Sequence, residues 1–233
     1  MDRRCIALYD SGAGGLTLLK VLKKKYPKEN FAYFSDRKNF PYGNKSAKEI
    51  AALAREKTES ILSFCPKAII FACNTLSTVA LEKYTNFPVK VFGVLPKIYP
   101  GERTLIISTP STAQSDYVKN LTLQSNTDVL PAFGLADEIE SWLGGGSKPD
   151  ISVGFNGCKT NYDAVVLGCT HYSYLKSDFE KFFSSSVIRD GFTETCDKIQ
   201  GWLPTYSNDS GTGEMFFNDE KDEYIFREFL KGF

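Results

Sequence analysis

Short apolar runs alternate with longer amphipathic segments along this chain. Four runs in its first half, rich in β-branched and aromatic residues, predict buried strands at 6–9, 31–34, 68–72 and 89–94. Apolar residues at helical spacing predict helices over 16–26 and 46–64, the second opened by a capping box of Ser46 and Glu49. Strands that alternate with helices are typical of a parallel sheet, so the pattern predicts an α/β fold.

The order of these strands repeats in the second half of the chain. Four further runs predict strands at 104–107, 128–130, 164–167 and 186–188. In each half the third strand leads into a cysteine, which is Cys73 in the first half and Cys169 in the second. Two matched halves that each place a thiol at the carboxyl end of a strand predict two facing domains with one shared cleft.

The expected fold is therefore α/β, with two pseudo-symmetric domains, mainly parallel sheets, and an active site in the cleft between the domains. The first domain is predicted to comprise residues 1–95 and a returning segment, 206–233, and the second domain residues 96–205. Turn-forming residues at 96–100 and around Pro204 mark the two crossings between them.

Composition narrows the class of protein. The 28 basic residues balance 28 acidic ones, and the dense basic cluster at 23–25 suits the end of a helix, so no nucleic-acid partner is expected. The first apolar run is too short for a signal peptide or a membrane helix, which predicts a cytoplasmic protein without a membrane partner. Six cysteines without a CxxC pair and a single histidine give no metal-ligand spacing, so free thiols are expected.

A glycine-rich segment, Asp10–Gly15, lies between the first predicted strand and the first predicted helix. Its glycines would let backbone N–H groups approach a carboxylate or phosphate at the helix N-terminus. The spacing differs from GxGxxG and from the P-loop, so nucleotide binding receives little support. Two structural alternatives stay open: a tight turn that needs positive φ, and Asp10 as the N-cap of the helix.

A second polar segment, 36–43, follows the second predicted strand. In open α/β sheets, ligands bind outside the carboxyl ends of the strands, which is where this segment begins. Tyr42 is a candidate to close over a small substrate. The alternative is a turn built by Pro41 and Gly43.

The two strand-ending cysteines carry the strongest chemical signal, although most cysteines are simply buried, as expected for Cys5 and Cys65. Each of the two is followed by a pair of hydrogen-bonding residues, namely Asn74 and Thr75, and Thr170 and His171. Inversion at a carbon acid needs two such groups, because one base removes the Cα proton from one face while an acid protonates the other. A thiol acts as a base only when deprotonated, so we expect Asp10 and His171 to tune the two sites. As the sole histidine, His171 could instead cap a helix.

Several sequence blocks, in the same order as in the glutamate racemase family, make the chain resemble that family. They are Asp10–Gly15, Phe34–Asp36 with Pro41–Lys45, Ala72–Thr75, and Leu167–Tyr172. The resemblance implies a two-domain α/β fold with pseudo-twofold symmetry, no pyridoxal phosphate or other cofactor, and no metal. It also implies interconversion of L- and D-glutamate, which supplies D-glutamate for peptidoglycan. Glutamate is then the expected small-molecule partner, and a homodimer is left open.

Carried over by position, the resemblance implies two bases and three assisting groups, which are Cys73, Cys169, Asp10, His171 and Glu140. The match around Glu140 is a loose one over residues 135–140. Substrate contacts carry over to Ser11, Pro41, Tyr42, Gly43, Asn74, Thr75, Thr109, Thr112 and Thr170. By the same resemblance, Cys73 serves the D-enantiomer and Cys169 the L-enantiomer.

The chain also departs from the family pattern. Arg37 stands where a threonine is usual, Ser108 replaces a glycine, and Ser173 replaces a proline. The stretch 131–133 fits poorly, and the chain is shorter around 144–162. These changes leave both cysteines in place and bear on substrate preference.

Three other functions fit parts of the pattern. A related racemase could act on aspartate or another amino acid, and a catalytically silent homologue could bind a ligand. A thiol hydrolase that uses Cys169 and His171 fits less well, because residues two apart on an extended chain point the same way but seldom touch. Exchange of the Cα proton with solvent separates racemases from the other two classes.

Overall fold

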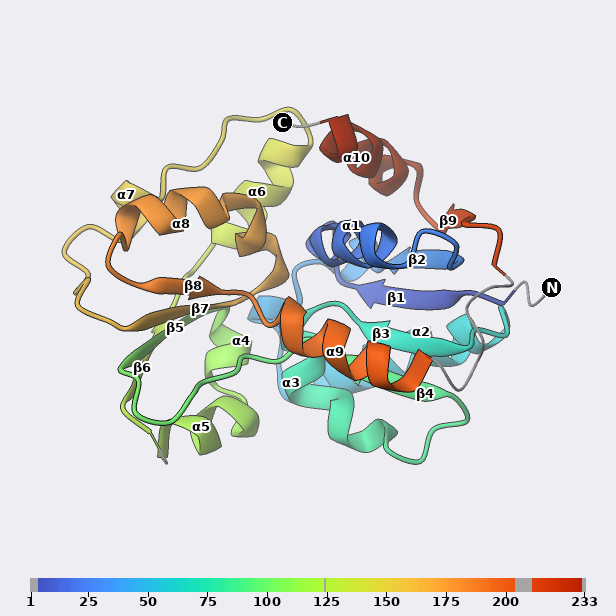
Figure 1. Ribbon diagram of the computed structural model, residues 1–233, viewed down its shortest axis with the longest axis horizontal. Coiled ribbons are helices and arrows are strands. Elements are labelled where there is room, and N and C mark those ends of the chain that lie inside the picture. Colours follow the sequence, from blue (N-terminus) through green and yellow to red (C-terminus); the bar gives the residue numbers. More distant parts are fainter. Residues whose placement is uncertain (1–3, 124, 204–210, 232–233) are drawn as a thin grey trace.

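The computed structural model describes residues 4–123, 125–203 and 211–231 of the 233-residue chain. Two sheets lie side by side, and helices pack around both (Figure 1). The first sheet has the strand order β4-β3-β1-β2-β9 and the second the order β6-β5-β7-β8, with every pairing parallel. We call the first sheet with the helices that pack on it the first lobe, and the second sheet with its helices the second lobe.

The strands end where polar segments begin. Those of the first sheet are β1 (Ile6–Asp10), β2 (Phe31–Ser35), β3 (Ala68–Phe71), β4 (Lys90–Gly93) and β9 (Met215–Phe217). Those of the second sheet are β5 (Thr104–Ser108), β6 (Thr127–Pro131), β7 (Ala164–Gly168) and β8 (Val187–Arg189). The eight strands β1 to β8 confirm the sequence prediction, while β9 was not predicted as a strand.

The longer helices are α1 (Leu16–Lys25), α2 (Ala47–Leu62), α3 (Asn74–Ala80), α5 (Asp116–Leu123), α6 (Leu135–Leu143), α8 (Lys176–Phe182), α9 (Phe192–Trp202) and α10 (Glu220–Lys231). Short turns of helix are α4 (Pro110–Ala113), α7 (Ile151–Gly154) and the 3-10 helices η1 (Arg37–Asn39), η2 (Tyr42–Asn44), η3 (Leu81–Tyr84) and η4 (Thr170–Leu175). Both predicted long helices of the first half are present. The capping box of Ser46 and Glu49 is confirmed at the start of α2, where each residue bonds the backbone N–H of the other.

The predicted repeat is visible in the strand order. Read from the outer edge, the first sheet runs β4-β3-β1-β2 and the second runs β8-β7-β5-β6, so the matched strands occupy the same places. In the first sheet β9 then adds on the far side of β2. Helix α9 contacts β4 of the first sheet. The division of the chain into two domains at 95 and 206 stays a prediction, and the expected crossing near Pro204 lies outside the described residues.

Strand burial follows from apolar side chains on both faces of each sheet. In β1, Ile6 and Leu8 belong to an apolar cluster that includes residues of α1, α9 and α10, whereas Ala7 and Tyr9 belong to a second cluster that includes residues of α2 and α3. A parallel sheet covered by helices on both sides needs such continuous apolar runs. The cluster on the α1 side extends without a break into the second lobe, so the two lobes share apolar packing where their strands end. Within the described ranges, no helix has the length and apolar character needed to cross a membrane.

Candidate active site

The two predicted thiols lie at matched positions in the two sheets. Cys73 follows β3 and is the N-cap of α3, and Cys169 follows β7 and is the N-cap of η4. Both residues keep an extended backbone before the chain turns into a helix, so each side chain stands at the carboxyl edge of its sheet. Each is 6% exposed. The two edges meet where the lobes contact.

The glycine-rich segment Asp10–Gly15 bridges the two cysteine neighbourhoods. The fully buried carboxylate of Asp10 accepts a hydrogen bond from the Gly12 N–H at 2.9 Å and one from the Thr170 hydroxyl at 3.2 Å. Thr170 belongs to the second lobe, so Asp10 joins the lobes beside Cys169. The N-cap of α1 is Gly15, so Asp10 caps the preceding turn and not the helix.

The glycines of this segment are required by close approach of the two lobes. None of Gly12, Gly14 and Gly15 has positive φ, so the alternative of a positive-φ turn is wrong. A Cβ on Gly14 would lie 2.5 Å from Nδ1 of His171 and 2.6 Å from the Thr170 hydroxyl oxygen. Only a residue without a side chain lets the first lobe reach the second at this point.

Cys73 lies on the Asp10 side of the site. Its sulfur is 3.7 Å from the Ser11 hydroxyl oxygen. Burial, with smaller contributions from the negative charges of Asp10 and Cys169, raises the pKa of Cys73 to about 12. At neutral pH this group is therefore a thiol that can donate a proton.

Cys169 lies beside a histidine and a carboxylate. Its sulfur is 3.9 Å from Nδ1 of His171, and Nε2 of His171 donates to Oε2 of Glu140 at 2.8 Å. The expectation that Cys169 and His171 seldom touch was wrong, because the chain leaves its extended path at Thr170 and η4 turns His171 back toward the sulfur. The three groups form a continuous polar path across the second lobe.

The charges along this path favour a protonated imidazole. Burial lowers the pKa of His171, but its hydrogen bonds to Cys169 and Glu140 outweigh burial and raise the pKa well above 6.5. Burial alone would raise the pKa of Glu140. The hydrogen bond to His171 and the charges of His171 and Arg37 outweigh it and lower the pKa to about 2. A protonated imidazole therefore lies beside the Cys169 sulfur.

Hydroxyl groups from both lobes form a cluster near Cys73. The Thr75 hydroxyl lies 2.9 Å from that of Thr109 and 3.0 Å from that of Thr112. The Asn74 amide donates to the Val94 carbonyl at 3.2 Å, and its buried oxygen has no hydrogen-bond partner among the described residues. Small hydroxyl and amide groups of this kind suit the carboxylates and the ammonium of an amino acid.

The loop after β2 contains three of the predicted site residues, Pro41, Tyr42 and Gly43, and each makes a different contact. The Tyr42 hydroxyl donates to Asp36 at 2.6 Å and lies 2.5 Å from the Tyr9 hydroxyl, so the phenol is held inside the first lobe. Gly43 packs against the second lobe, since a Cβ there would lie 2.7 Å from Cβ of Thr109. Pro41 leads into η2 as its N-cap.

Sequence reasoning missed the partners of Arg37, which it noted only as a departure from a family pattern. The Arg37 guanidinium bonds to Glu140 in α6 and to Asp222 in α10, and its Nε lies 3.4 Å from Asp219. Asp222 also accepts the hydroxyl hydrogen of Ser35. The one available signal was the charge itself, because an arginine after a buried strand needs an acidic partner.

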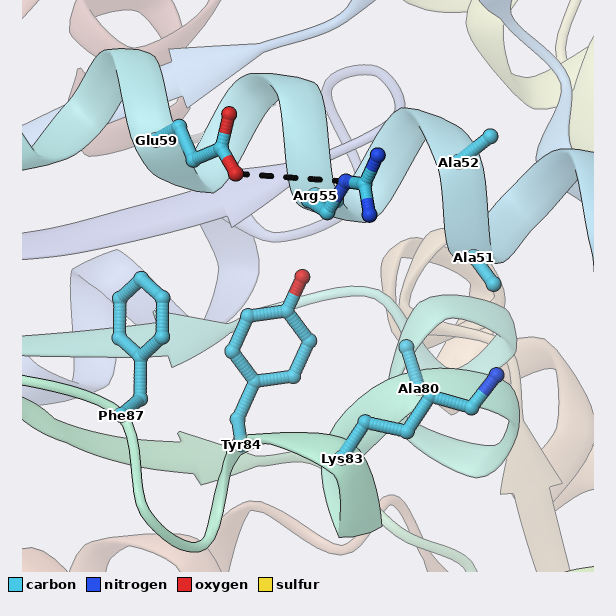
Figure 2. Close-up of a pocket in the computed structure, with 8 residues that line it drawn as sticks. All are labelled: Ala51, Ala52, Arg55, Glu59, Ala80, Lys83, Tyr84 and Phe87. Atoms are coloured by element: carbon cyan, nitrogen blue, oxygen red, sulfur yellow. Dashed lines mark ion pairs between the residues drawn. The ribbon is translucent and has the colours of Figure 1, made fainter.

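The outer surface carries pockets away from the thiols. One of about 470 Å³ lies between α2 and the segment from α3 to η3, with Tyr84 and Phe87 across from the ion pair of Arg55 and Glu59 (Figure 2). None of the predicted site residues lines it. Among residues 4–123, 125–203 and 211–231, no group of three or more histidine, cysteine, aspartate or glutamate side chains is arranged to hold a metal ion.

Comparison with known proteins gives one consistent result. No protein-family model matches the chain. The glutamate racemase of Clostridium acetobutylicum is 34% identical over 218 residues, which cover 86% of this chain and 84% of the relative. The solved glutamate racemase of Francisella tularensis, in complex with D-glutamate, superposes with a TM-score of 0.82 at 26% identity, over 99% of this chain and 95% of the other. That of Thermus thermophilus, in complex with beta-chloro-D-alanine, gives 0.82 at 25% identity, over 97% and 93%.

Proposed function

The chain belongs to the glutamate racemase family, and from this premise we propose that it interconverts L- and D-glutamate by proton transfer at Cα between the thiols of Cys73 and Cys169. The observation that carries the proposal is the pair of matched cysteines at the carboxyl edges of two equivalent sheets. No cofactor enters the proposed reaction, because thiols with suitable neighbours supply both the base and the acid.

In the proposed direction from L to D, Cys169 acts as the base. Its thiolate, stabilised by the imidazolium of His171, takes the proton from one face of Cα. Cys73, held as a neutral thiol by burial, donates its proton to the opposite face. The reverse direction exchanges the two roles, so each enantiomer meets the thiols in a different protonation state.

Substrate recognition is proposed to use the polar groups that surround the thiols. The hydroxyl cluster of Thr75, Thr109 and Thr112 offers donors for a carboxylate, and the unpaired oxygen of Asn74 offers an acceptor for the ammonium. The Ser11 hydroxyl lies 3.7 Å from the Cys73 sulfur, and Thr170, the residue after Cys169, donates to Asp10. We further propose that the D-glutamate formed supplies peptidoglycan synthesis.

The proposal is tested by circular dichroism of L-glutamate incubated with purified protein and no added cofactor, beside L-aspartate and other amino acids. We expect the glutamate signal to decay to zero, and to do so faster than that of aspartate at equal concentration. Faster racemisation of aspartate would overturn the assignment of substrate.

A second candidate function draws on the contact between Cys169 and His171, since nucleophile, base and carboxylate are also the order in a thiol hydrolase. A hydrolase reaction of this kind gives no role to Cys73, the cysteine at the position matched to Cys169. Release of a cleaved product from an ester or amide, without exchange of the Cα proton, would support the hydrolase instead.

A further inference from the structure

Arg37 lies where three parts of the chain meet. It belongs to η1 of the first lobe, and its two terminal nitrogens bond to Oε1 of Glu140 in α6 and to Oδ1 of Asp222 in α10. The Asp222 side chain is 0% exposed and is held from the other side by Ser35. A planar guanidinium with both ends engaged fixes its partners in direction as well as in distance.

The second oxygen of Glu140 faces the proposed chemistry. Oε2 accepts from Nε2 of His171 at 2.8 Å and from the Ala13 N–H at 3.2 Å. A carboxylate that is held at only one oxygen can rotate about its last bond. With Arg37 on Oε1, the carboxylate of Glu140 is held at both oxygens, so Oε2 stays directed at the imidazole.

We propose that Arg37 is a positioning residue, which orients the Glu140 carboxylate toward His171 and thereby links helix α10 to proton transfer at Cys169. The inference rests on the proposed function, in which Cys169 serves the L-enantiomer. It predicts that loss of Arg37 harms the Cys169 half of the site and spares the Cys73 half. An ion pair that only stabilised the fold would affect both halves alike.

The first test reads His171 directly. Because the chain has a single histidine, the imidazole resonance of untagged, histidine-labelled protein belongs to His171 alone. The charged groups that face this ring are Cys169, Glu140 and Asp10, with Arg37 acting through Glu140.

In the variant Arg37→Met, we expect the midpoint of the histidine titration to move to lower pH by about 1 or more, because the freed carboxylate no longer holds the ring as a cation. If Arg37 acted only through its own positive charge, its removal would move the midpoint to higher pH. A midpoint that is unchanged or higher would overturn the inference.

The second test uses a one-sided reaction, because both thiols act in every racemisation. The substrates are the two enantiomers of one diastereomer of 3-chloroglutamate, called the L-form and the D-form after their configuration at Cα. A thiolate takes the Cα proton, the electron pair of the C–H bond forms a C=C bond, and chloride leaves. The enamine then hydrolyses to 2-oxoglutarate and ammonium, which are measured.

With Arg37→Met, elimination from the L-form should fall roughly 10- to 100-fold, while elimination from the D-form should change less than about twofold. Asp222→Asn should show the same sidedness. The control is Arg189→Met, which breaks a partly buried arginine–carboxylate pair with Glu102 elsewhere in the second lobe and should alter neither reaction.

Failure of the proposed function and failure of the role of Arg37 give different results in these tests. Wild-type protein that neither racemises glutamate nor eliminates chloride would overturn the proposed function and this inference with it. Active wild-type protein with equal losses on both sides in Arg37→Met would overturn the inference alone.

Discussion

At the scale of single residues, the two thiols have unlike surroundings. Cys73 has Ser11 and the charge of Asp10 nearby, whereas Cys169 has the imidazole of His171. The first neighbourhood keeps a proton on the Cys73 sulfur, and the second sets a protonated imidazole beside the Cys169 sulfur. Each side can therefore be tuned by its own partners.

Removal of either thiol should abolish racemisation without unfolding the protein. Cys73→Ala and Cys169→Ala should each lower kcat by roughly 10²–10⁴-fold, because the acid or the base is lost. Replacement by serine should be nearly as damaging, since a hydroxyl is a much weaker acid than a thiol. Cys196→Ala is the control, because Cys196 is also buried but lies in α9, outside the site. Near-normal racemisation by either site variant would contradict the two-thiol mechanism.

Asp10 should make stability depend on pH. Burial raises its pKa from 3.8 to about 6, although His171 and the Gly12 N–H act to lower it. The folded protein thus keeps a proton that the unfolded chain releases, so the contribution of Asp10 to stability is full below about pH 4 and is lost as pH rises through 6.

Asp10→Asn cannot titrate, so it should gain stability relative to wild type between pH 4 and 6, by up to about 3 kcal/mol. Urea unfolding of both proteins at pH 4, 5, 6 and 7 measures this difference. A difference that stays constant across the series would show that Asp10 is already ionised in the folded protein at pH 4.

The positions of the two cysteines in the fold could be predicted from the sequence, because a local pattern marks them. A cysteine at the end of an apolar strand can be recognised within six residues, and its edge position follows from the parallel sheet. The partners of Arg37 could not be found this way, because Glu140 and Asp222 are 103 and 185 residues distant in sequence. Such a pairing depends on how three elements meet in space.

At the scale of elements, the glycine-rich segment sets how closely the first lobe approaches η4. Gly14→Ala would put a methyl group 2.5 Å from Nδ1 of His171 and 2.6 Å from the Thr170 hydroxyl oxygen, and both side chains are buried, which leaves it little room. We expect racemisation to fall by roughly 10²-fold, since misplacement by about 1 Å has effects of this size. The control is Gly154→Ala in α7, where no atom lies within 4 Å of the added carbon. Equal activity of the two variants would mean that the segment moves freely.

Element prediction worked best for central strands. The runs of β1, β3, β5 and β7 are fully buried, and such strands need apolar residues at every position. Strand β9 was missed because it is three residues long and partly exposed. It is a strand only because it pairs with β2, which the local sequence does not reveal. A short edge strand leaves too weak a pattern to separate it from a loop.

At the scale of the whole molecule, four strands of each sheet repeat in the same order, but the side chains at matched positions differ in charge. Asp10 ends β1 beside the residue that precedes Cys73, and Ser108 ends β5 opposite Gly168, which precedes Cys169. The matched position is therefore acidic in one lobe and neutral in the other. The second lobe obtains its charge from Glu140 through His171 instead.

The contact between lobes should also govern substrate affinity. Thr75 of the first lobe reaches Thr109 and Thr112 of the second, so Thr75→Val removes a donor from the proposed carboxylate site. KM for glutamate should rise roughly tenfold, as expected for a lost hydrogen bond to a charged group, with a smaller change in kcat. Thr78→Val is the control, because the Thr78 hydroxyl bonds only within α3. Comparable changes of KM and kcat in both variants would mean that the effect comes from a disturbed helix α3 and not from the lost donor at Thr75.

In the proposed reaction two thiols on opposite faces of Cα exchange its proton with solvent, and this exchange can be followed by isotope incorporation. Each enantiomer of glutamate is incubated in D₂O with wild-type protein, and the product is analysed early for deuterium at Cα. We expect one deuterium in nearly every molecule of inverted product, because the thiol that delivers the proton has exchanged with solvent. Inverted product that retains the original hydrogen would mean that a single group moves the proton from face to face, and would contradict the two-thiol account.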